Sequence, residues 1–248
     1  MLSEQRYDVI LKLLEEKKSV TVTELKELLN TSESTVRRDI SALHNAGRLV
    51  KVFGGAVASD RNYITQEPTV AQKSEVFKEE KHLLARYAAS MIGAEEFIYI
   101  DAGTTTGCMI DYIVEERAVF VTNAVVHAQK LAAKGLRVIL IGGELKNSTE
   151  ALVGSQAVEL LRQYHFTKGF FGTNGISKKA GFTTPDANEA LTKKAAMEQC
   201  QNCYVLSDHS KFGEISAVTF APFQGAKILT DSLPEGYGDC GNIEVVEN

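Results

Sequence analysis

Apolar residues in the first fifty positions recur at helical spacing in three stretches. The spacing predicts one helix over residues 3–16, a shorter one after Thr21 and another after Ser32. Each helix has one apolar stripe, made of Tyr7, Ile10, Leu11 and Leu14 in the first, Leu25, Leu28 and Leu29 in the second, and Val36, Ile40 and Leu43 in the third. Facing stripes of this size are enough for a small core.

The residues at the helix ends support these boundaries. Thr21 stands three residues before Glu24, which is the spacing of a capping box, and Ser32 is a favourable N-cap for the third helix. We expect Gly47 to end that helix in a left-handed conformation. Two β-prone strips flank Gly54, so residues 48–57 are predicted to form a hairpin.

The polar side of the third helix carries the chemistry of this N-terminal part. Arg37 and Arg38 lie opposite the apolar stripe, and arginine pairs with guanine in the major groove or with phosphate. Taken alone, two adjacent arginines are more often a solvated helix face. However, two short helices, a tight turn and a following hairpin follow the plan of a winged helix-turn-helix. The predicted DNA-binding residues are Thr21, Ser32, Ser34, Thr35, Arg37, Arg38, Ser41, Arg48 and Lys51.

A different pattern begins after Gly93. Short apolar runs each end in a small polar cluster, and helical patterns separate most of them, which predicts a parallel sheet covered on both faces. The runs are 97–100, 119–121, 138–141, 169–171 and 204–206, and the clusters after them are 101–107, 122–123, 142–144, 172–175 and 207–211. The predicted helices of this part include 70–91, 124–133, 151–163 and 188–199.

Ligands of such sheets bind outside the carboxyl ends of the strands, where these polar clusters would gather. The turn 101–107 combines glycines, threonines and a helix N-terminus, which together suit a phosphate. Because no Gly-Lys-Ser/Thr follows, nucleotide hydrolysis is not indicated. Lys211 supplies a cation for an anionic ligand, and Asp101 and Asp208 can accept hydrogen bonds from sugar hydroxyls. The alternative is that these clusters are ordinary polar turns.

Composition and charge narrow the class of protein. The hydrophobic content is 44% and no apolar run reaches membrane-spanning length, so we expect a cytoplasmic protein without a membrane partner. Residues 1–57 carry 9 Lys and Arg against 8 Asp and Glu, whereas residues 58–248 carry 18 against 24. A DNA-binding module with so little net charge needs well-placed arginines and two copies for each site.

The cysteines indicate no cofactor. Cys200 and Cys203 form a lone C-x-x-C, and no second pair or histidine follows at zinc-site spacing. We therefore expect buried, reduced thiols, with no metal and no cofactor.

Residues 32–39, read Ser-Glu-Ser-Thr-Val-Arg-Arg-Asp, together with Gly54-Gly55-Ala56, resemble the DeoR family of bacterial transcriptional regulators. The resemblance continues through 101–105, 122–123, 141–143 and the Asp-x-Ser-Lys of 208–211, and so covers nearly the whole chain. It implies an α/β protein with an N-terminal winged helix-turn-helix and a larger α/β sensor domain, similar to ribose-5-phosphate isomerases and CoA-transferases. It also implies double-stranded operator DNA as a partner, usually as a repressor, and a phosphorylated sugar as effector.

The resemblance implies particular effector-binding residues. They are Lys81, Asp101, Gly103, Thr104, Thr105, Thr106, Thr122, Asn123, Gly142, Gly143, Asp208 and Lys211. The loop 181–189 most resembles the fructose-operon repressors of the family, which implies fructose 1-phosphate; tagatose 6-phosphate, used by lactose repressors, is the near alternative. The Thr230-Asp231 pair is followed by Ser-Leu-Pro, where family members often continue with isoleucine.

We therefore expect a DNA-binding domain over 1–57, a linker over 58–69 and a sugar-phosphate-sensing domain over 70–248. The protein would be a homo-oligomer, a dimer or tetramer, that represses a sugar-utilisation operon until a phosphorylated sugar binds. The alternative is a sugar-phosphate isomerase with an accessory DNA-binding head. A complete helix-turn-helix has no use in such a reaction, so the sequence favours a regulator that is not an enzyme.

Overall fold

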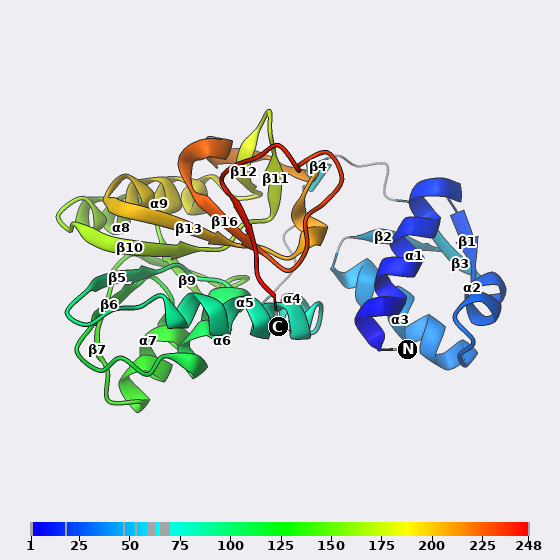
Figure 1. The fold of residues 1–248 in the computed structure, drawn as a ribbon, viewed down its shortest axis with the longest axis horizontal. Coiled ribbons are helices and arrows are strands. Elements are labelled where there is room, and N and C mark those ends of the chain that lie inside the picture. Colours follow the sequence, from blue (N-terminus) through cyan, green and yellow to red (C-terminus); the bar gives the residue numbers. More distant parts are fainter. Residues whose placement is uncertain are drawn as a thin grey trace. The chain divides into compact units, whose positions relative to one another are not determined.

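The computed structural model describes residues 2–17, 19–46, 48–52, 54–58, 63–64 and 70–247, and within them the chain forms two compact units (Figure 1). The smaller unit comprises Met1–Asn62 with Ala71–Phe77, and the larger comprises Tyr63–Val70 with Lys78–Asn248. Residues 59–62 and 65–69 of the proposed linker lie outside the described residues.

The smaller unit is a helix-turn-helix with a wing. Its elements are α1 (Ser3–Lys17), β1 (Ser19–Thr21), α2 (Val22–Leu28), α3 (Glu33–Asn45), β2 (Leu49–Val52) and β3 (Gly55–Ala58). The predicted caps are confirmed: Thr21 and Glu24 form the reciprocal capping box of α2, and Ser32 Oγ accepts the N–H of Thr35 at 3.2 Å. The predicted end of α3 at Gly47 lies outside the described residues.

Strand β1 is a feature that the sequence did not predict. It pairs with β3, which also pairs with β2, so that the wing is an antiparallel sheet in the order β1-β3-β2. Gly55 lies at this junction, where a Cβ would come 2.1 Å from the carbonyl oxygen of Val20. The neighbouring Gly54 turns the hairpin with a φ of +81°, a conformation that favours glycine.

The helix predicted over residues 70–91 is wrong as a single element. It is two helices, α4 (Val70–Ser74) and α5 (Lys78–Ser90), separated by Phe77 with a φ of +54°. Val76 and Phe77 are buried in the core of the smaller unit, where the Phe77 ring meets Tyr7 edge-on at a centroid distance of 6.4 Å. The apolar pattern was continuous because Val76 and Phe77, which follow α4, and the apolar side of α5 are all buried, but in different cores.

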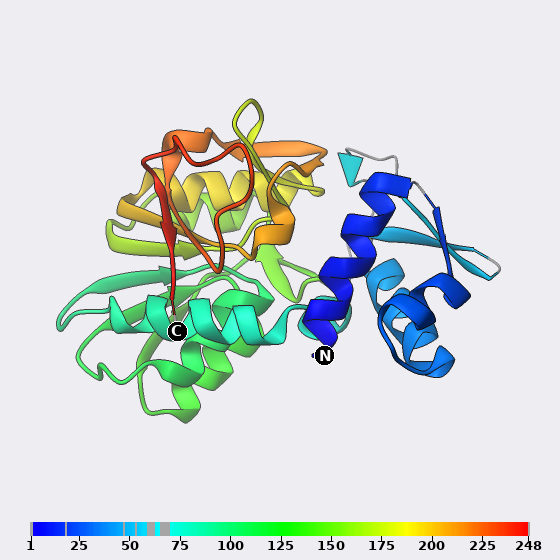
Figure 2. The same cartoon turned by 45° about the vertical axis from the view of Figure 1, so that its right-hand side comes forward.

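The larger unit is built on a parallel sheet in the order β17-β16-β13-β10-β5-β6-β7, which confirms the predicted class. Its strands are β5 (Phe97–Ile100), β6 (Val119–Thr122), β7 (Arg137–Leu140), β10 (Phe166–Phe171), β13 (Cys200–Leu206), β16 (Lys227–Thr230) and β17 (Ile243–Val245). One face is covered by α5, α6 (Thr104–Tyr112) and α7 (Val125–Ala133), and the other by α8 (Ser155–Leu161) and α9 (Ala187–Glu198). Figure 2 shows these two layers, with α9 (yellow) above the sheet and α5 (cyan-green) below it.

Several shorter strands surround the carboxyl end of this sheet. They are the hairpin β8 (Glu144–Lys146) with β9 (Ala151–Val153), the antiparallel sheet of β11 (Gly175–Ser177), β12 (Gly181–Thr184) and β15 (Val218–Ala221), and the pair β4 (Tyr63–Ile64) with β14 (Ile215–Ser216). Short 3-10 helices, η1 (His209–Lys211) and η2 (Phe223–Gly225), complete the unit. The helix predicted from residue 151 is wrong at its start, because residues 151–153 pair with β8 and α8 begins only after Gly154, whose φ is +96°.

Candidate DNA-binding surface and sensor pocket

The outer side of α3 presents the predicted arginines. Arg37 and Arg38 are exposed, and Ser34, three residues before Arg37, shares their side of the helix. Arg37 pairs with Glu33 at 2.6 Å, but both side chains are more than half exposed, so this ion pair is weak and the guanidinium is available to another anion. The ammonium of Lys51, on β2 of the wing, donates to Ser41 Oγ of α3 at 2.8 Å. This bond holds the positive charge of Lys51 beside the helix that carries Arg37 and Arg38.

Other predicted DNA-binding residues have structural roles as well. The hydroxyls of Thr21 and Ser32 cap α2 and α3, and Thr35 is hydrogen-bonded to Ser32. Arg48 is half-buried at the start of the wing. The structure therefore brings Ser34, Arg37, Arg38, Ser41 and Lys51 onto one exposed surface of the smaller unit.

Asp39 ends the Arg-Arg-Asp run but faces the other way. Its carboxylate accepts two hydrogen bonds from Arg6 of α1, from Nε at 2.6 Å and from Nη2 at 3.0 Å. The side chains are only 11% and 2% exposed, so this is a buried, bidentate ion pair that ties α3 to α1. The helical spacing from Val36 and Leu43 was the signal that places Asp39 on the inner side.

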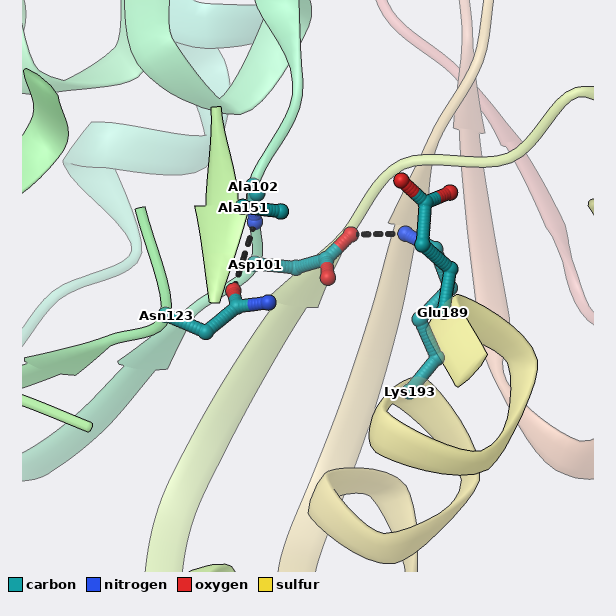
Figure 3. A pocket seen from close by; sticks show the side chains of 6 residues that line it. All are labelled: Asp101, Ala102, Asn123, Ala151, Glu189 and Lys193. Atoms are coloured by element: carbon teal, nitrogen blue, oxygen red, sulfur yellow. Dashed lines mark hydrogen bonds and ion pairs between the residues drawn. The ribbon is translucent and has the colours of Figure 1, made fainter. Parts of the chain in front are cut away.

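The larger unit has a pocket at the carboxyl ends of β5 and β6. Asp101, Ala102, Asn123, Ala151, Glu189 and Lys193 line it (Figure 3). The sequence predicted two of these residues, Asp101 and Asn123, as effector contacts. The pocket lies at the strand ends, as expected for ligand sites of parallel sheets.

Asp101 forms an ion pair with Lys193, a lysine that no sequence motif indicated. The ammonium of Lys193, on α9, points at Asp101 Oδ2 (Figure 3). It also donates to the carbonyl of Gly172 at 3.2 Å. The N–H of Gly172 donates to the same Asp101 oxygen at 3.1 Å. Burial raises the pKa of Asp101, while the charge of Lys193 and these hydrogen bonds oppose that rise.

Glu189 lies one helical turn before Lys193 and carries the second carboxylate of the pocket. Its Oε1 accepts the hydroxyl of Thr149 at 2.5 Å and lies 3.2 Å from the ammonium of Lys146, so the β8–β9 hairpin reaches into the site. Its Oε2 accepts the hydroxyl of Thr184 at 3.2 Å. The i, i+4 spacing of Glu189 and Lys193 showed that they share a helix face, but not that this face turns to the strand ends.

Several predicted effector residues instead hold the surrounding backbone. Asn123 Oδ1 accepts from Tyr99 at 3.1 Å and from the N–H of Ala102 at 3.0 Å. Thr106 is fully buried and donates to the carbonyl of Asp101 at 2.7 Å. The hydroxyl of Thr122, also fully buried, accepts the N–H of Ala124 at 3.1 Å. These side chains shape the turns after β5 and β6.

The remaining predicted effector residues do not line the pocket. Gly103 and Thr104 are half-buried at the start of α6, and Thr105 is buried there. Asp208 accepts the N–H of Ser210 at 3.0 Å as the cap of η1, which also contains the half-buried Lys211. Gly142 and Gly143 follow β7, and Lys81 is buried on α5.

A buried histidine lies beneath the first turn of α6. A Cβ on Gly107 would come 2.7 Å from His127 Nε2, so only glycine fits at that position. His127 Nδ1 has no hydrogen-bond partner among the described residues. Burial lowers the pKa of His127 to about 4, so the ring is neutral at pH 7.

The cysteines and the other metal-ligating residue types form no further site in the described part of the chain. The thiols of Cys200 and Cys203 are reduced and donate to the carbonyls of Ala196 and Met197 at 3.1 and 3.5 Å. In the part of the chain that the structure describes, no group of three or more His, Cys, Asp or Glu residues is arranged to hold a metal ion. No helix among the described residues is both long and apolar enough to span a bilayer.

A winged helix-turn-helix with an arginine-bearing outer helix, joined to an α/β unit with a polar pocket, defines a DNA-binding transcriptional regulator. The DeoR-like helix-turn-helix domain matches residues 6–62, and the DeoR C-terminal sensor domain matches residues 76–232. The chain belongs to the DeoR family, as its motifs indicated.

Relatives in this family are regulators. The chain is 43% identical to the uncharacterized HTH-type transcriptional regulator FruR of Bacillus subtilis (strain 168), over 95% of this chain and 93% of that one. It is 34% identical to the lactose phosphotransferase system repressor of Staphylococcus aureus (strain MRSA252), over 89% and 88%. These relatives confirm a regulator rather than an enzyme. The ribose 5-phosphate isomerase of Methanocaldococcus jannaschii covers 54% of each chain at 12% identity and a TM-score of 0.40, which is too distant a similarity to guide function.

Proposed function

We propose that this protein is a cytoplasmic repressor of a sugar-utilisation operon, with fructose use favoured, and that a phosphorylated sugar relieves the repression. The observation that carries the proposal is the pocket at the strand ends, where the buried carboxylate of Asp101 lies directly before the glycine–threonine turn that begins α6. A carboxylate accepts hydrogen bonds from sugar hydroxyls, and a helix start binds phosphate. Two relatives, named FruR and lactose phosphotransferase system repressor, support the sugar assignment.

In this proposal Asp101 binds hydroxyls, and the backbone N–H groups of Gly103, Thr104 and Thr105 bind the phosphate. Lys211 approaches the phosphate as the cation, and Lys81, Asp208, Gly142 and Gly143 complete the surroundings of the ligand. The remaining predicted residues, Thr106, Thr122 and Asn123, act by holding the turn in shape.

On the DNA side, two copies of the chain place two α3 helices in the major grooves of a two-part operator. Arg37 and Arg38 contact bases or phosphates, and Lys51 contacts the backbone beside them. The sugar phosphate relieves repression only to the extent that it binds the DNA-free arrangement more tightly than the DNA-bound one.

Two measurements on the purified protein test this function. A thermal-shift titration should show stabilisation by fructose 1-phosphate, or by tagatose 6-phosphate if the sugar assignment is wrong, and little by fructose or inorganic phosphate. The same sugar phosphate should then release a duplex selected by the protein from random sequences. Lys211→Ala should keep duplex binding and lose the release. Failure of every sugar phosphate to shift the melting temperature would refute the sensor assignment.

A further inference from the structure

The pocket contains a second carboxylate and an ion pair that the proposed contacts do not use. We propose that Glu189 and Asp101 together form a subsite for adjacent hydroxyl groups of the sugar. Lys193 positions Asp101 in this subsite. The hydroxyl of Thr149 donates to Glu189 until a ligand hydroxyl replaces it. This inference deepens the proposed function and rests on it.

The charges decide which end of the ligand enters this subsite. Glu189 and Asp101 are 6% and 1% exposed, from α9 and from the end of β5, and both line the same small space. Ionised carboxylates are only acceptors, so their partners must be donors. The nearby ammonium groups of Lys193 and Lys146 are already paired with Asp101 and Glu189, so this space offers hydrogen-bond acceptors rather than a net positive charge for a phosphate. The hydroxyl-bearing carbons therefore enter between Glu189 and Asp101, and the phosphate remains toward the start of α6.

Lys193 explains how Asp101 stays available as a charged acceptor. Its ammonium neutralises one carboxylate oxygen from the side of α9, while Oδ1 accepts no hydrogen bond from the described residues. Lys193 is itself 6% exposed and also bonded to Gly172, so it is held in place. It acts through Asp101 rather than on the ligand.

Thr149 is the group that a ligand must displace. The space inside the pocket is about 10 Å³, room for about one water molecule, whereas small-molecule sites typically have roughly 300 Å³ or more, so a sugar phosphate has to move side chains to enter. The hydroxyl of Thr149 already makes the bond to Glu189 that a sugar hydroxyl would make. Exchange of one hydroxyl for another conserves the hydrogen bond of the buried carboxylate.

Three variants of the full chain test the subsite by calorimetric titration with fructose 1-phosphate and with inorganic phosphate. Glu189→Gln should lower the affinity for fructose 1-phosphate about 30-fold. The affinity for inorganic phosphate should not change, because only the sugar hydroxyls bond to the carboxylate. Thr149→Val keeps the shape of the side chain but removes the competing hydroxyl, so it should raise the affinity for fructose 1-phosphate about tenfold. Glu198→Gln makes the same change at an exposed position of α9 and should have no effect.

The outcomes separate the two proposals. If the wild type binds no sugar phosphate, the proposed function fails and the subsite falls with it. If the wild type binds but Glu189→Gln binds equally well, or Thr149→Val fails to tighten binding, the subsite is wrong and the sensor function stands. The Thr149 variant predicts a gain, which damage to the fold does not imitate.

A separate observation concerns the same hairpin and the chain that leads to the DNA-binding unit. The carbonyl of Ser148, next to Thr149, accepts the N–H of Val70 at 3.2 Å. Val70 begins α4, and residues 71–77 belong to the smaller unit, whose core contains Val76 and Phe77. The turn between β8 and β9 therefore touches the pocket carboxylate with one residue and the connecting chain with the next.

We infer that this turn transmits occupancy of the pocket to the DNA-binding unit. When a ligand replaces Thr149 on Glu189, the turn moves, and the bond from Val70 to Ser148 changes with it. The chain from Val70 to Phe77 then carries the change into the DNA-binding unit, because Phe77 is anchored in that unit's core.

Val70→Pro tests the transmission. Proline is well accommodated at the first position of a helix and lacks the N–H that Ser148 accepts. The variant should bind the selected duplex and fructose 1-phosphate as the wild type does, but the sugar phosphate should no longer release the duplex. Hydrogen exchange of the Val70 amide in the wild type gives a second readout, and it should change when fructose 1-phosphate is added. Normal release by Val70→Pro, or ligand-independent exchange at Val70, would overturn the inference.

Discussion

The ion pair between Arg6 and Asp39 should govern the stability of the DNA-binding unit without touching DNA. Asp39→Leu removes the carboxylate and leaves the Arg6 guanidinium buried with its principal partner lost. The hydrogen bond that Arg6 donates to Asp39 raises the pKa of Arg6 in the wild type. Without that bond the guanidinium still cannot escape by losing its proton, because arginine stays protonated throughout the pH range in which proteins fold. Breaking one side of such a buried pair costs about 3 to 5 kcal/mol.

A second substitution should restore most of that loss. Because an apolar pair needs no desolvation of charge, Arg6→Met with Asp39→Leu should return to within about 1 kcal/mol of the wild type. The coupling energy between the two positions is then about 2 to 4 kcal/mol, the size expected for residues in direct contact rather than for distant ones.

Hydrogen exchange followed by mass spectrometry on the full chain can measure this locally. A loss of about 3 kcal/mol in local stability speeds exchange of the α3 amides roughly 150-fold, while β5 in the other unit serves as an internal reference. The double variant should show nearly normal exchange and should bind the selected duplex. Fast exchange in the double variant would contradict the pairing argument. Normal exchange without duplex binding would show that Arg6 or Asp39 contacts DNA after all.

Three further outcomes follow from single positions. Arg38→Ala should lower duplex affinity at least about tenfold and leave hydrogen exchange in α3 unchanged. If Arg38 contacts a phosphate, the slope of log affinity against log salt concentration should also become less steep by about one. A changed exchange rate in α3 would point to misfolding instead. Gly55→Ala would put a Cβ 2.1 Å from the Val20 carbonyl oxygen and should destabilise the wing by about 2 kcal/mol or more. Gly54→Ala has open space around its Cβ but a φ of +81°, so in the same exchange assay it should cost only about 1 kcal/mol. His127 is protonated in the unfolded chain below its ordinary pKa of 6.5 but in the folded protein only near 4, so stability is complete above pH 6.5 and falls as the pH drops toward 4. That loss is about 3 kcal/mol between pH 7 and pH 4, and denaturant titrations of His127→Gln should lack it; an equal loss in the variant would assign the pH dependence to other groups.

The sequence by itself determined the elements that depend on neighbouring residues. The stripes of α1 and α3, the caps at Thr21 and Ser32, and the alternation of apolar runs with helices are all short-range patterns, and the structure has them. The predicted stripe of α2 is wrong at Leu28, which is 55% exposed, while Leu25 and Leu29 are buried. Because parallel strands end at the same edge, Asp101 and Asn123 could be placed together from order alone, and they line one pocket.

Tertiary structure decided what depends on contacts across long separations. Lys193 meets Asp101 across 92 residues, and Thr149 meets Glu189 across 40, so no local periodicity distinguishes these side chains from ordinary helix and turn residues. Residues 70–91 read as one helix because burial in either of two cores gives the same apolar pattern, and only packing assigns Phe77 to the DNA-binding unit. Residues 151–153 form a strand because β8 offers them backbone partners, which overrides the helical spacing of their side chains. The composition of the pocket and the division of residues 70–91 between two cores therefore come from the three-dimensional packing, because burial and pairing are properties of distant partners rather than of adjacent residues.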